Sequence, residues 1–583
     1  MIIAWGCAAL LTHFFLMGTI WRHASLESQA EEIHGYVLKS IYLSWIWFFV
    51  LFGLKQFDAE RILVAAATIG SAGLLLYRFR TSRAVYRIPM DWARRITLIA
   101  SLVLILVYAG KLGGIFTEWD SVVSWNRWGM ELARNEYRPT NAAYPILFPA
   151  LWSLIYKAQQ TPDIWFVAKA SLIVLPISSI LWLTHIALRI PVVIGALFLL
   201  ACCDTLFFNV SANTSGYMDA PLAAMGLSAL LFFLRYLQTN EVGDAKSTDY
   251  LMLACVSGGL ASITKQAGIV FCILIAAMIV IEVVKKRLAL RVAAYHWAVL
   301  FIPPALFAWI FLQTGLDTVG NLGHLRGLSA QNSHGSKLAN SAWLLCKELG
   351  WLSFPIVALG LFGLLLPTLT SVRVFAVLCC LVFVGGFLAF ADCCSYDVRN
   401  SYWLLPFLLV PAFVGLQNAS RWSPNLTQMA LTRDVMLPSM TVSIVGAMLL
   451  VVAASVGALK DDWVRNLQSE KQKHIGMRKV TPMLYSLKPQ VDDGACLLTD
   501  YALVRYLPGF EKSKTTICSG RDSLRCLQSA LLKCPRSLVL HTLGASDAKE
   551  YVKSAVASGQ ARMVAETQGY SFLEFSSGVP SGQ

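Results

Sequence analysis

Two carboxylates, Glu118 and Asp120, directly follow a long apolar run near residues 96–115. Just outside a hydrocarbon boundary, partial desolvation and a neighbouring like charge both make a carboxylate more basic. Such a group can take a proton from a hydroxyl as a general base. Arg127 follows Asp120 at helical spacing with two tryptophans beside it, which predicts a helix in the membrane interface. The alternative is an aromatic belt flanked by ordinary acidic residues.

Three further charged residues stand where an apolar sequence gives them little reason to be. Asp219 opens an apolar run, Lys265 lies between two short runs, and Arg399 precedes Tyr402 at the start of another. A charge in or beside a membrane segment is a functional hypothesis by default. The structural alternatives are a helix N-cap for Asp219, a snorkelling side chain for Lys265 and an ion pair with a nearby aspartate for Arg399.

The composition defines the class of protein that must position these residues. Of 583 residues, 56% are apolar and 14% are charged, whereas ordinary soluble domains are roughly a quarter charged. The mean hydropathy is +0.59. These values exclude a soluble enzyme, a disordered chain, collagen and a coiled coil. The formal charge of +14 fits cationic cytoplasmic loops of a membrane protein, so no nucleic-acid partner is expected.

Fourteen apolar runs are long enough to predict membrane spans. The loop between the third and fourth runs holds six arginines against one aspartate, so it should be cytoplasmic, and the loop 116–163 should then be outside. The runs lie near 2–20, 41–56, 61–77, 96–115, 164–187, 190–210, 220–237, 249–264, 266–284, 292–313, 351–368, 373–391, 402–417 and 437–458.

Residues 144–158 form a further apolar stretch that is short and is broken by Pro145 and Pro149. If it crossed the membrane, the cationic segment 285–291 would face outward, against the usual distribution of lysine and arginine. We therefore predict a juxtamembrane helix outside the membrane.

The polar segment 459–583 predicts a small soluble α/β domain outside the membrane, with no nucleotide-binding motif. Its four cysteines, Cys496, Cys518, Cys526 and Cys534, allow three disulfide pairings, and the sequence does not choose among them. The predicted strands are 495–499, 515–518 and 537–542, the helices are 521–534 and 545–559, and a hairpin is expected near Gly569.

Over most of residues 96–420 the sequence resembles the GT-C glycosyltransferases, in the branch of protein O-mannosyltransferases and lipid A aminoarabinose transferases. The resemblance depends on the order and sidedness of several short motifs, none of them specific alone. They are the acid pair Glu118 and Asp120, an interfacial helix followed by Tyr144-Pro145, Asp219-Ala-Pro-Leu, Thr264-Lys265, and Arg399 before Tyr402 and Leu404-Leu405-Pro406.

The apolar runs and the resemblance together predict an all-α, GT-C-like polytopic membrane protein with about 14 transmembrane helices and a small C-terminal extracytoplasmic α/β domain. Residues 96–458 are the expected GT-C-like catalytic domain and 459–583 the soluble domain, while the extra N-terminal helices in residues 1–95 depart from the simplest family arrangement. A polyprenyl-phosphate sugar is the implied donor, and a glycan, lipid or protein is the acceptor. Transfer with inversion is implied on the outer face of a membrane, which we expect to be the bacterial inner membrane.

The resemblance also implies roles for individual residues. Asp120, or else Glu118, is the implied base, while Lys265 and Arg399 are suited to hold the donor phosphate. Asp219 is expected to orient a cation or a hydroxyl. The other residues expected to bind substrate are Arg127, Tyr144 and Tyr402.

Metal dependence is left open. Many relatives have an acidic, basic or histidine residue before the proline of the second interfacial helix, where this chain has Tyr144. His324 and His334 in the outer loop are the candidate ligands for a divalent ion.

Two other functions are compatible with the sequence. A transporter or flippase of a lipid-linked saccharide would also need many spans, although we find no internal repeat. An oligosaccharide ligase or oligosaccharyltransferase would use related chemistry.

Overall fold

The computed structural model divides into two compact units, Met1–Phe116 with Trp128–Ala458, and Thr117–Arg127 with Leu459–Gln583. We call them the helical unit and the C-terminal unit. The structure describes residues 2–21, 29–54, 60–67, 69–70, 92–111, 116, 121–135, 144–162, 165–240, 247–313, 334–366, 370–393, 398–422, 489–499, 515–517, 523–534, 536–542, 546–567 and 570–575.

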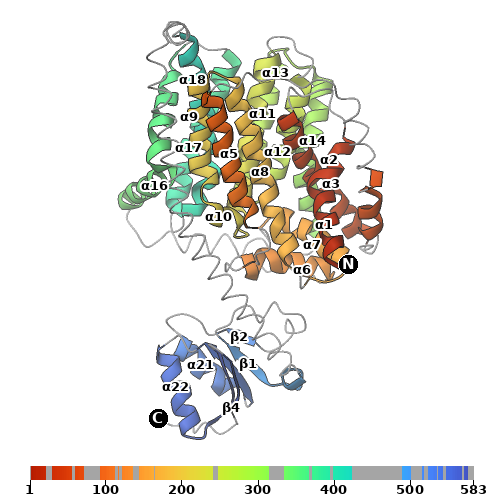
Figure 1. The fold of residues 1–583 in the computed structure, drawn as a ribbon, viewed down its shortest axis with the longest axis vertical. Helices are drawn as coiled ribbons and strands as arrows, with labels where there is room; N and C mark the ends of the chain where they lie inside the picture. The colour runs from red at the N-terminus through yellow and green to blue at the C-terminus, as the bar shows by residue number, and fades with distance from the viewer. Residues whose placement is uncertain are drawn as a thin grey trace. The chain divides into compact units, whose positions relative to one another are not determined.

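The helical unit consists of helices throughout its described part (Figure 1). Long apolar runs adopt helices in lipid because a helix satisfies all of its backbone hydrogen bonds internally. The helices are α1 (Ile2–Leu11), η1 (Thr12–Leu16), α2 (Met17–Ile20), α3 (Gln29–Leu54), α5 (Trp92–Ala109), α6 (Arg127–Ala133), α7 (Leu147–Gln159), α8 (Phe166–Arg189), α9 (Val192–Cys202), η4 (Cys203–Phe207), α10 (Val210–Thr214), α11 (Asp219–Asn240), α12 (Ser247–Ser262), η5 (Gln266–Gly268), α13 (Ile269–Val284), α14 (Leu290–Gln313), α16 (His334–Gly363), α17 (Thr370–Cys393), η6 (Val398–Leu404) and α18 (Pro406–Trp422).

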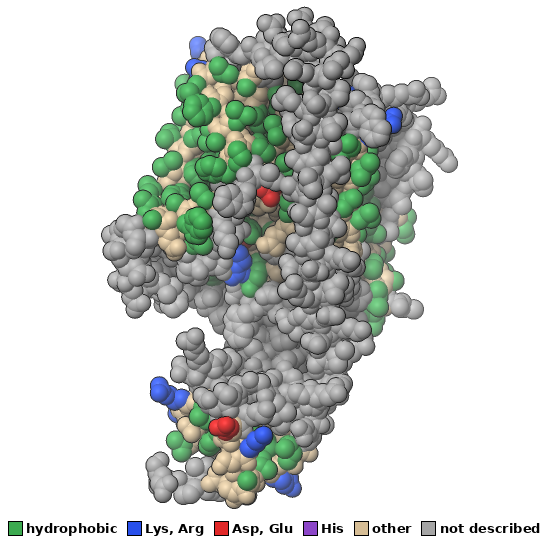
Figure 2. Space-filling model, turned by 60° about the vertical axis from the view of Figure 1, so that its left-hand side comes forward, with side chains coloured by type: hydrophobic (Ala, Val, Ile, Leu, Met, Phe, Trp, Pro, Cys, Tyr) green, Lys and Arg blue, Asp and Glu red, His purple; other side chains and the backbone are tan. Residues whose placement is uncertain are grey.

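Within the described ranges, seven helical segments are long and apolar enough to cross a membrane. Their outward-facing side chains are apolar, for example Ile273 at 58% and Leu381 at 61% exposure, and Figure 2 shows hydrophobic side chains over most of the described surface of this unit. The prediction of a helical integral membrane protein is confirmed. The number fourteen stays a prediction, since the run 437–458 lies outside the described residues and 61–77 is described only in part.

Burial separates central from peripheral helices in this bundle. The apolar window of α11 is 89% buried, whereas that of α17 is 28% buried. α11 packs against α12, α18 and η6, so its first residue, Asp219, lies among several elements rather than facing lipid.

The helix predicted at 144–158 is α7, and it differs from the prediction in its surroundings. Its thirteen residues span roughly 20 Å, which is too short to cross about 30 Å of hydrocarbon. All ten residues from Leu147 to Tyr156 are buried, however, so α7 does not lie along the interface with one face in lipid. The reason is that α1, α3 and α8 pack around it.

Two consecutive residues, Glu60 and Arg61, join the N-terminal helices to one another and to α7. Oε1 of Glu60 lies 2.5 Å from Nε2 of His13, and its Oε2 accepts a hydrogen bond from Trp47 on α3 at 2.8 Å. Arg61 donates from Nε to the carbonyl oxygen of Ala158, in the last turn of α7, at 2.8 Å. The extra helices for which the sequence offers no role therefore brace α7.

The C-terminal unit contains a five-stranded sheet in the order β2-β1-β3-β5-β4, which confirms the predicted small α/β module. β1 pairs in parallel with β2 and β3, and β5 pairs antiparallel with β3 and β4. One face packs on α21 and α22 through Leu498, Val539 and Leu573. The elements are β1 (Cys496–Thr499), β2 (Thr515–Ile517), α21 (Ser523–Lys533), β3 (Ser537–Thr542), α22 (Ser546–Ala557), β4 (Ala561–Thr567) and β5 (Tyr570–Phe575), while η3 (Ser121–Asn126) also belongs to this unit.

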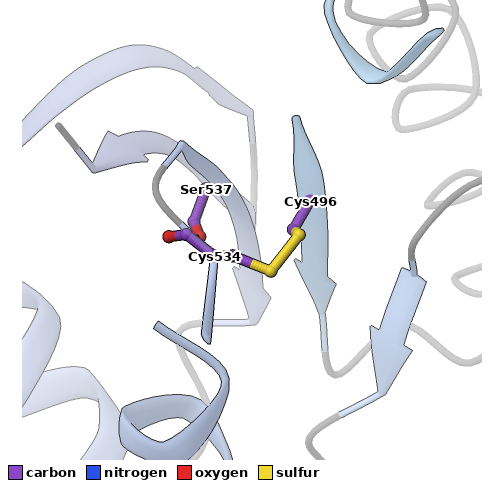
Figure 3. The surroundings of a disulfide bond; sticks show 3 residues. All are labelled: Cys496, Cys534 and Ser537. Carbon is purple, nitrogen blue, oxygen red and sulfur yellow. A yellow bond between two sulfur atoms is a disulfide. The ribbon is translucent and has the colours of Figure 1, made fainter. Parts of the chain in front are cut away.

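A disulfide joins Cys496 on β1 to Cys534, which follows α21 (Figure 3). Ser537 at the start of β3 donates a hydrogen bond to the carbonyl oxygen of Cys534 at 3.3 Å. Cys526 is also disulfide-bonded. The structure thus selects the pairing that contains Cys496–Cys534 among the three that the sequence allows.

Candidate functional site

Lys265 forms the centre of a polar cluster at the ends of the helices in the helical unit. Its Nζ donates to Oδ1 of Asp219 at 2.5 Å and to Oδ1 of Asn400 at 3.2 Å. The lysine side chain is 18% exposed and the aspartate side chain 9%. Hydrogen bonds to two oxygens restrict the rotamers of the lysine, so its Nζ is held in one position beside Asp219 and Asn400.

The turn between α12 and α13 presents this lysine. After α12, Thr264 donates from its hydroxyl to the carbonyl oxygen of Leu260, and Lys265 is extended with φ of −155°. Gly268 then lies so close to the carbonyl oxygen of Ala261 that a Cβ there would clash. The glycine therefore permits the tight return of the chain into α13.

Asp219 is held at the other side of the ion pair by the start of α11. It is the acidic residue in the first turn, where the helix dipole favours a negative charge. Pro221 also lies in the first turn, where its missing N–H does no harm. Together these residues define where α11 begins and so where the carboxylate stands.

Arg399 provides a second cation next to the first. Its guanidinium lies 3.7 Å from the centroid of the Tyr217 ring, a cation–π contact. Tyr217 is two residues before Asp219, and Arg399 directly precedes Asn400 on η6. Three contacts therefore position the two cations. Asp219 and Asn400 bind Lys265, and the ring of Tyr217 contacts Arg399.

The segment before α7 reaches the same turn through the backbone. Leu147 donates its N–H to the carbonyl oxygen of Ile263 at 3.1 Å, two residues before Lys265. The ring of Tyr144 lies 6.1 Å from that of Trp128 on α6. Figure 1 places α6, α7 and α10 at one end of the helical unit.

α6 crosses α7 at close range because of Gly129. A Cβ there would lie 3.2 Å from the carbonyl oxygen of Pro149 and 3.3 Å from Cβ of Trp152. The ring of Phe116 lies 4.7 Å from that of Trp152. Phe116 and Gly129 therefore both contact α7.

The structure brings together some of the predicted residues and leaves others apart. Asp219 and Lys265 are in contact, Arg399 adjoins them through Asn400, and Tyr402 is buried on the same short helix η6. Arg127 belongs to the other unit. Glu118, Asp120 and His324 lie outside the described residues, as do Asp397 and the side chains of His334 and Asp392.

Within the described residues no three His, Cys, Asp or Glu side chains converge on a point suited to a metal ion. The polar cluster itself offers one carboxylate beside two cations, which is not a cation-binding set.

Sequence reasoning missed three polar residues. Asn400 and Tyr217 stand inside the motifs that it quoted, and their positions beside Arg399 and Asp219 are the only signal. The third is Asp204 on η4, which accepts a hydrogen bond from Ser353 on α16 at 2.7 Å. An acidic residue inside the apolar run 190–210 could have drawn attention to it.

The cluster is suited chemically to an anion with several oxygens. A lysine ammonium and an arginine guanidinium are the usual partners of a phosphate, and the arginine can bind two oxygens at once. Asn400 and Tyr217 hold these two cations without contributing charge of their own. The bundle thus defines an integral membrane protein with a prearranged cationic site at the ends of its helices.

Comparison with known proteins finds a likeness in fold only. No family model and no curated protein matches the sequence. The chain is similar to the solved structure of ArnT from Cupriavidus metallidurans bound to undecaprenyl phosphate, with 14% identity and a TM-score of 0.48 over 82% of this chain and 97% of that one. For ArnT in the apo state the identity is 12%, the TM-score 0.45 and the coverage the same.

Proposed function

We propose that the protein is a membrane glycosyltransferase that moves a sugar from a polyprenyl-phosphate donor to a hydroxyl acceptor. The observation that carries the proposal is the cluster of Lys265, Asp219 and Asn400, with Arg399 beside it. A glycosyl phosphate leaves as an anion, so its departure needs fixed cations close to lipid. The helical unit supplies the two cations, Lys265 and Arg399, and its apolar helices supply the contact with lipid. The motifs that resemble the GT-C enzymes include these same two residues.

In the proposed reaction a hydroxyl oxygen of the acceptor attacks the anomeric carbon of the donor sugar. The bond between that carbon and the phosphate oxygen breaks as the new glycosidic bond forms, with inversion. Asp120 takes the hydroxyl proton, with Glu118 as the alternative base. Lys265 and Arg399 stabilise the negative charge that develops on the departing polyprenyl phosphate.

The outer face of the bacterial inner membrane is the proposed location of the reaction. The arginine-rich loop between residues 78 and 95 supports this orientation, because lysine and arginine accumulate on the cytoplasmic side. The disulfide between Cys496 and Cys534 also supports it, since such bonds persist in oxidising compartments.

Transfer by the purified protein is the direct test. The protein is incubated with radiolabelled polyprenyl-phosphate sugars and extracted glycans, lipids or proteins, and the label is followed into the acceptor. A labelled product that is absent with Lys265→Ala supports the proposal and identifies the acceptor. Movement of the donor between leaflets of a vesicle without any labelled product would contradict it and indicate a flippase.

A further inference from the structure

Five exposed cations lie near the turn where α13 ends and α14 begins. The turn that carries Lys265 lies at the other end of α13. The segments 282–291 and 370–373 contain a single acid, Glu282, whose side chain is buried. The cations all follow or begin apolar spans, which end at Val284 and start at Leu290 and Thr370. They are Lys285, Lys286, Arg287, Arg291 and Arg373.

This cluster is held in place between two helices. Ser371, in the first turn of α17, accepts hydrogen bonds from Nη1 of Arg287 at 2.7 Å and from Nζ of Lys285 at 3.4 Å. The same hydroxyl donates to Oε1 of Glu282 at 3.0 Å. Two cations of the α13–α14 turn are thus joined to α17, where Arg373 lies two residues further on.

The backbone of the turn is also fixed, with an unusual residue at its tightest point. Lys286 donates to the carbonyl oxygen of Val283 and Arg287 to that of Glu282, both at 2.9 Å, which is the Schellman arrangement at a helix end. Lys286 occupies the left-handed position, with φ of 57°, where glycine is the usual residue. A lysine there is conformationally unfavourable, and strained residues concentrate at functional positions.

Exposed apolar side chains flank the cations on both helices. Val284 is 74% exposed immediately before Lys285, and Leu290 is 64% exposed immediately before Arg291. A ligand bound here would meet positive charge at the level of the lipid headgroups and hydrocarbon beside it. A free anion would use only the first of these features, whereas an anionic lipid would use both.

We propose that the α13–α14 turn and the first turn of α17 bind the headgroup phosphate of an anionic membrane phospholipid. The acyl chains lie against Val284 and Leu290, and Lys286 supplies a cation that a glycine would not. This site is separate from the cluster around Lys265 and does not depend on the proposed glycosyl transfer.

Lipid retention by the purified full-length protein tests the proposal. The protein is equilibrated in detergent with equal amounts of phosphatidylglycerol and phosphatidylcholine, and bound lipid is counted by native mass spectrometry. We expect several-fold more phosphatidylglycerol on the wild type. Equal retention of the two lipids would overturn the proposal.

Lys286→Gly separates binding from folding. Because glycine fits the left-handed position, the melting temperature of the Lys286→Gly variant should be unchanged or higher than that of the wild type. The variant should nevertheless retain several-fold less phosphatidylglycerol. Arg373→Gln should also retain less phosphatidylglycerol than the wild type. Lys553 is an exposed cation of the C-terminal unit, and Lys553→Gln should retain as much as the wild type. Wild-type retention by both Lys286→Gly and Arg373→Gln would overturn the proposal.

Two competitors identify the source of the phosphate. A large excess of inorganic phosphate should displace little phosphatidylglycerol, and complete displacement would indicate an ion site instead. Undecaprenyl phosphate that is retained in preference to phosphatidylglycerol, and lost in Lys286→Gly, would assign the site to a polyprenyl lipid and overturn the choice of phospholipid.

Discussion

Nζ of Lys265 lies 2.5 Å from Oδ1 of Asp219, although 46 residues separate them in the chain. The lysine comes from the turn after α12 and the aspartate from the first turn of α11. The side chain of Lys265 is mostly removed from water, and the carboxylate of Asp219 offsets part of the cost of burying its ammonium group. The pair therefore holds the ammonium group in one position, as the proposed contact with a donor phosphate requires.

Removal of the aspartate charge should affect both stability and donor use. Breaking a buried ion pair at one partner costs about 3–5 kcal/mol, so we expect Asp219→Asn to lower the melting temperature and the kcat/KM for donor. Thermal unfolding and donor kinetics on one preparation measure the two effects. Asp249→Asn, which changes the acid in the first turn of α12, is the control and should leave donor kinetics unchanged.

The contact between Arg399 and Tyr217 predicts an asymmetric pair of aromatic variants. Tyr217→Phe keeps the ring under the guanidinium and should retain near-normal donor kcat/KM, whereas Tyr217→Ala should lower it several-fold. Arg399→Lys should not restore the activity lost in Arg399→Ala, because an ammonium cannot bind two phosphate oxygens in the same way. Equal activity of the lysine variant and the wild type would argue against a bidentate contact.

The base assignment can be tested without any structural assumption about residues 117–120. Asp120→Asn keeps the shape of the side chain but cannot accept the proton, so turnover should fall by roughly 10²- to 10⁴-fold. Glu118→Gln, measured in the same assay, should have a smaller effect. A large loss only in Glu118→Gln would exchange the two roles, and full activity in both variants would refute the proposed mechanism.

The buried pair of His13 and Glu60 should stabilise the N-terminal helices. Both side chains are at most 1% exposed, so Glu60→Ala leaves Nε2 of the buried His13 without its hydrogen-bond partner and should lower the free energy of unfolding by about 1–3 kcal/mol. Arg562→Gln breaks a pair with Glu574 in which the arginine is 78% exposed, and we expect no measurable change. Thermal unfolding of both variants makes the comparison.

Reporter fusions test the predicted orientation. Both termini and the loops 116–163, 211–219 and 314–350 should face away from the cytoplasm, because only that arrangement places the arginine-rich loops inside. A fusion at residue 130 or 500 should therefore be active with a reporter that works outside the cytoplasm. Activity of a cytoplasmic reporter at either position would reverse the orientation.

The sequence by itself determined the class of protein and most of the elements. Apolar runs predict membrane helices because the hydrocarbon core imposes a minimum length, which is a local property of the chain. The alternation of strand-like and amphipathic helical segments, which is also a local property of the chain, predicted the C-terminal module. Lys265 and Arg399 could be singled out because a charged residue is unusual in such surroundings.

Only the tertiary structure decided which residues meet. Asn400 binds Lys265 across 135 residues, Tyr217 lies under Arg399, and Cys496 pairs with Cys534 among three possible arrangements. The burial of α7 also depends on α1 and α3, which come from the far N-terminal part of the chain. A local pattern records whether a segment is apolar or helical, but it does not record which other segment packs against it, and these contacts depend on the packing of the whole bundle.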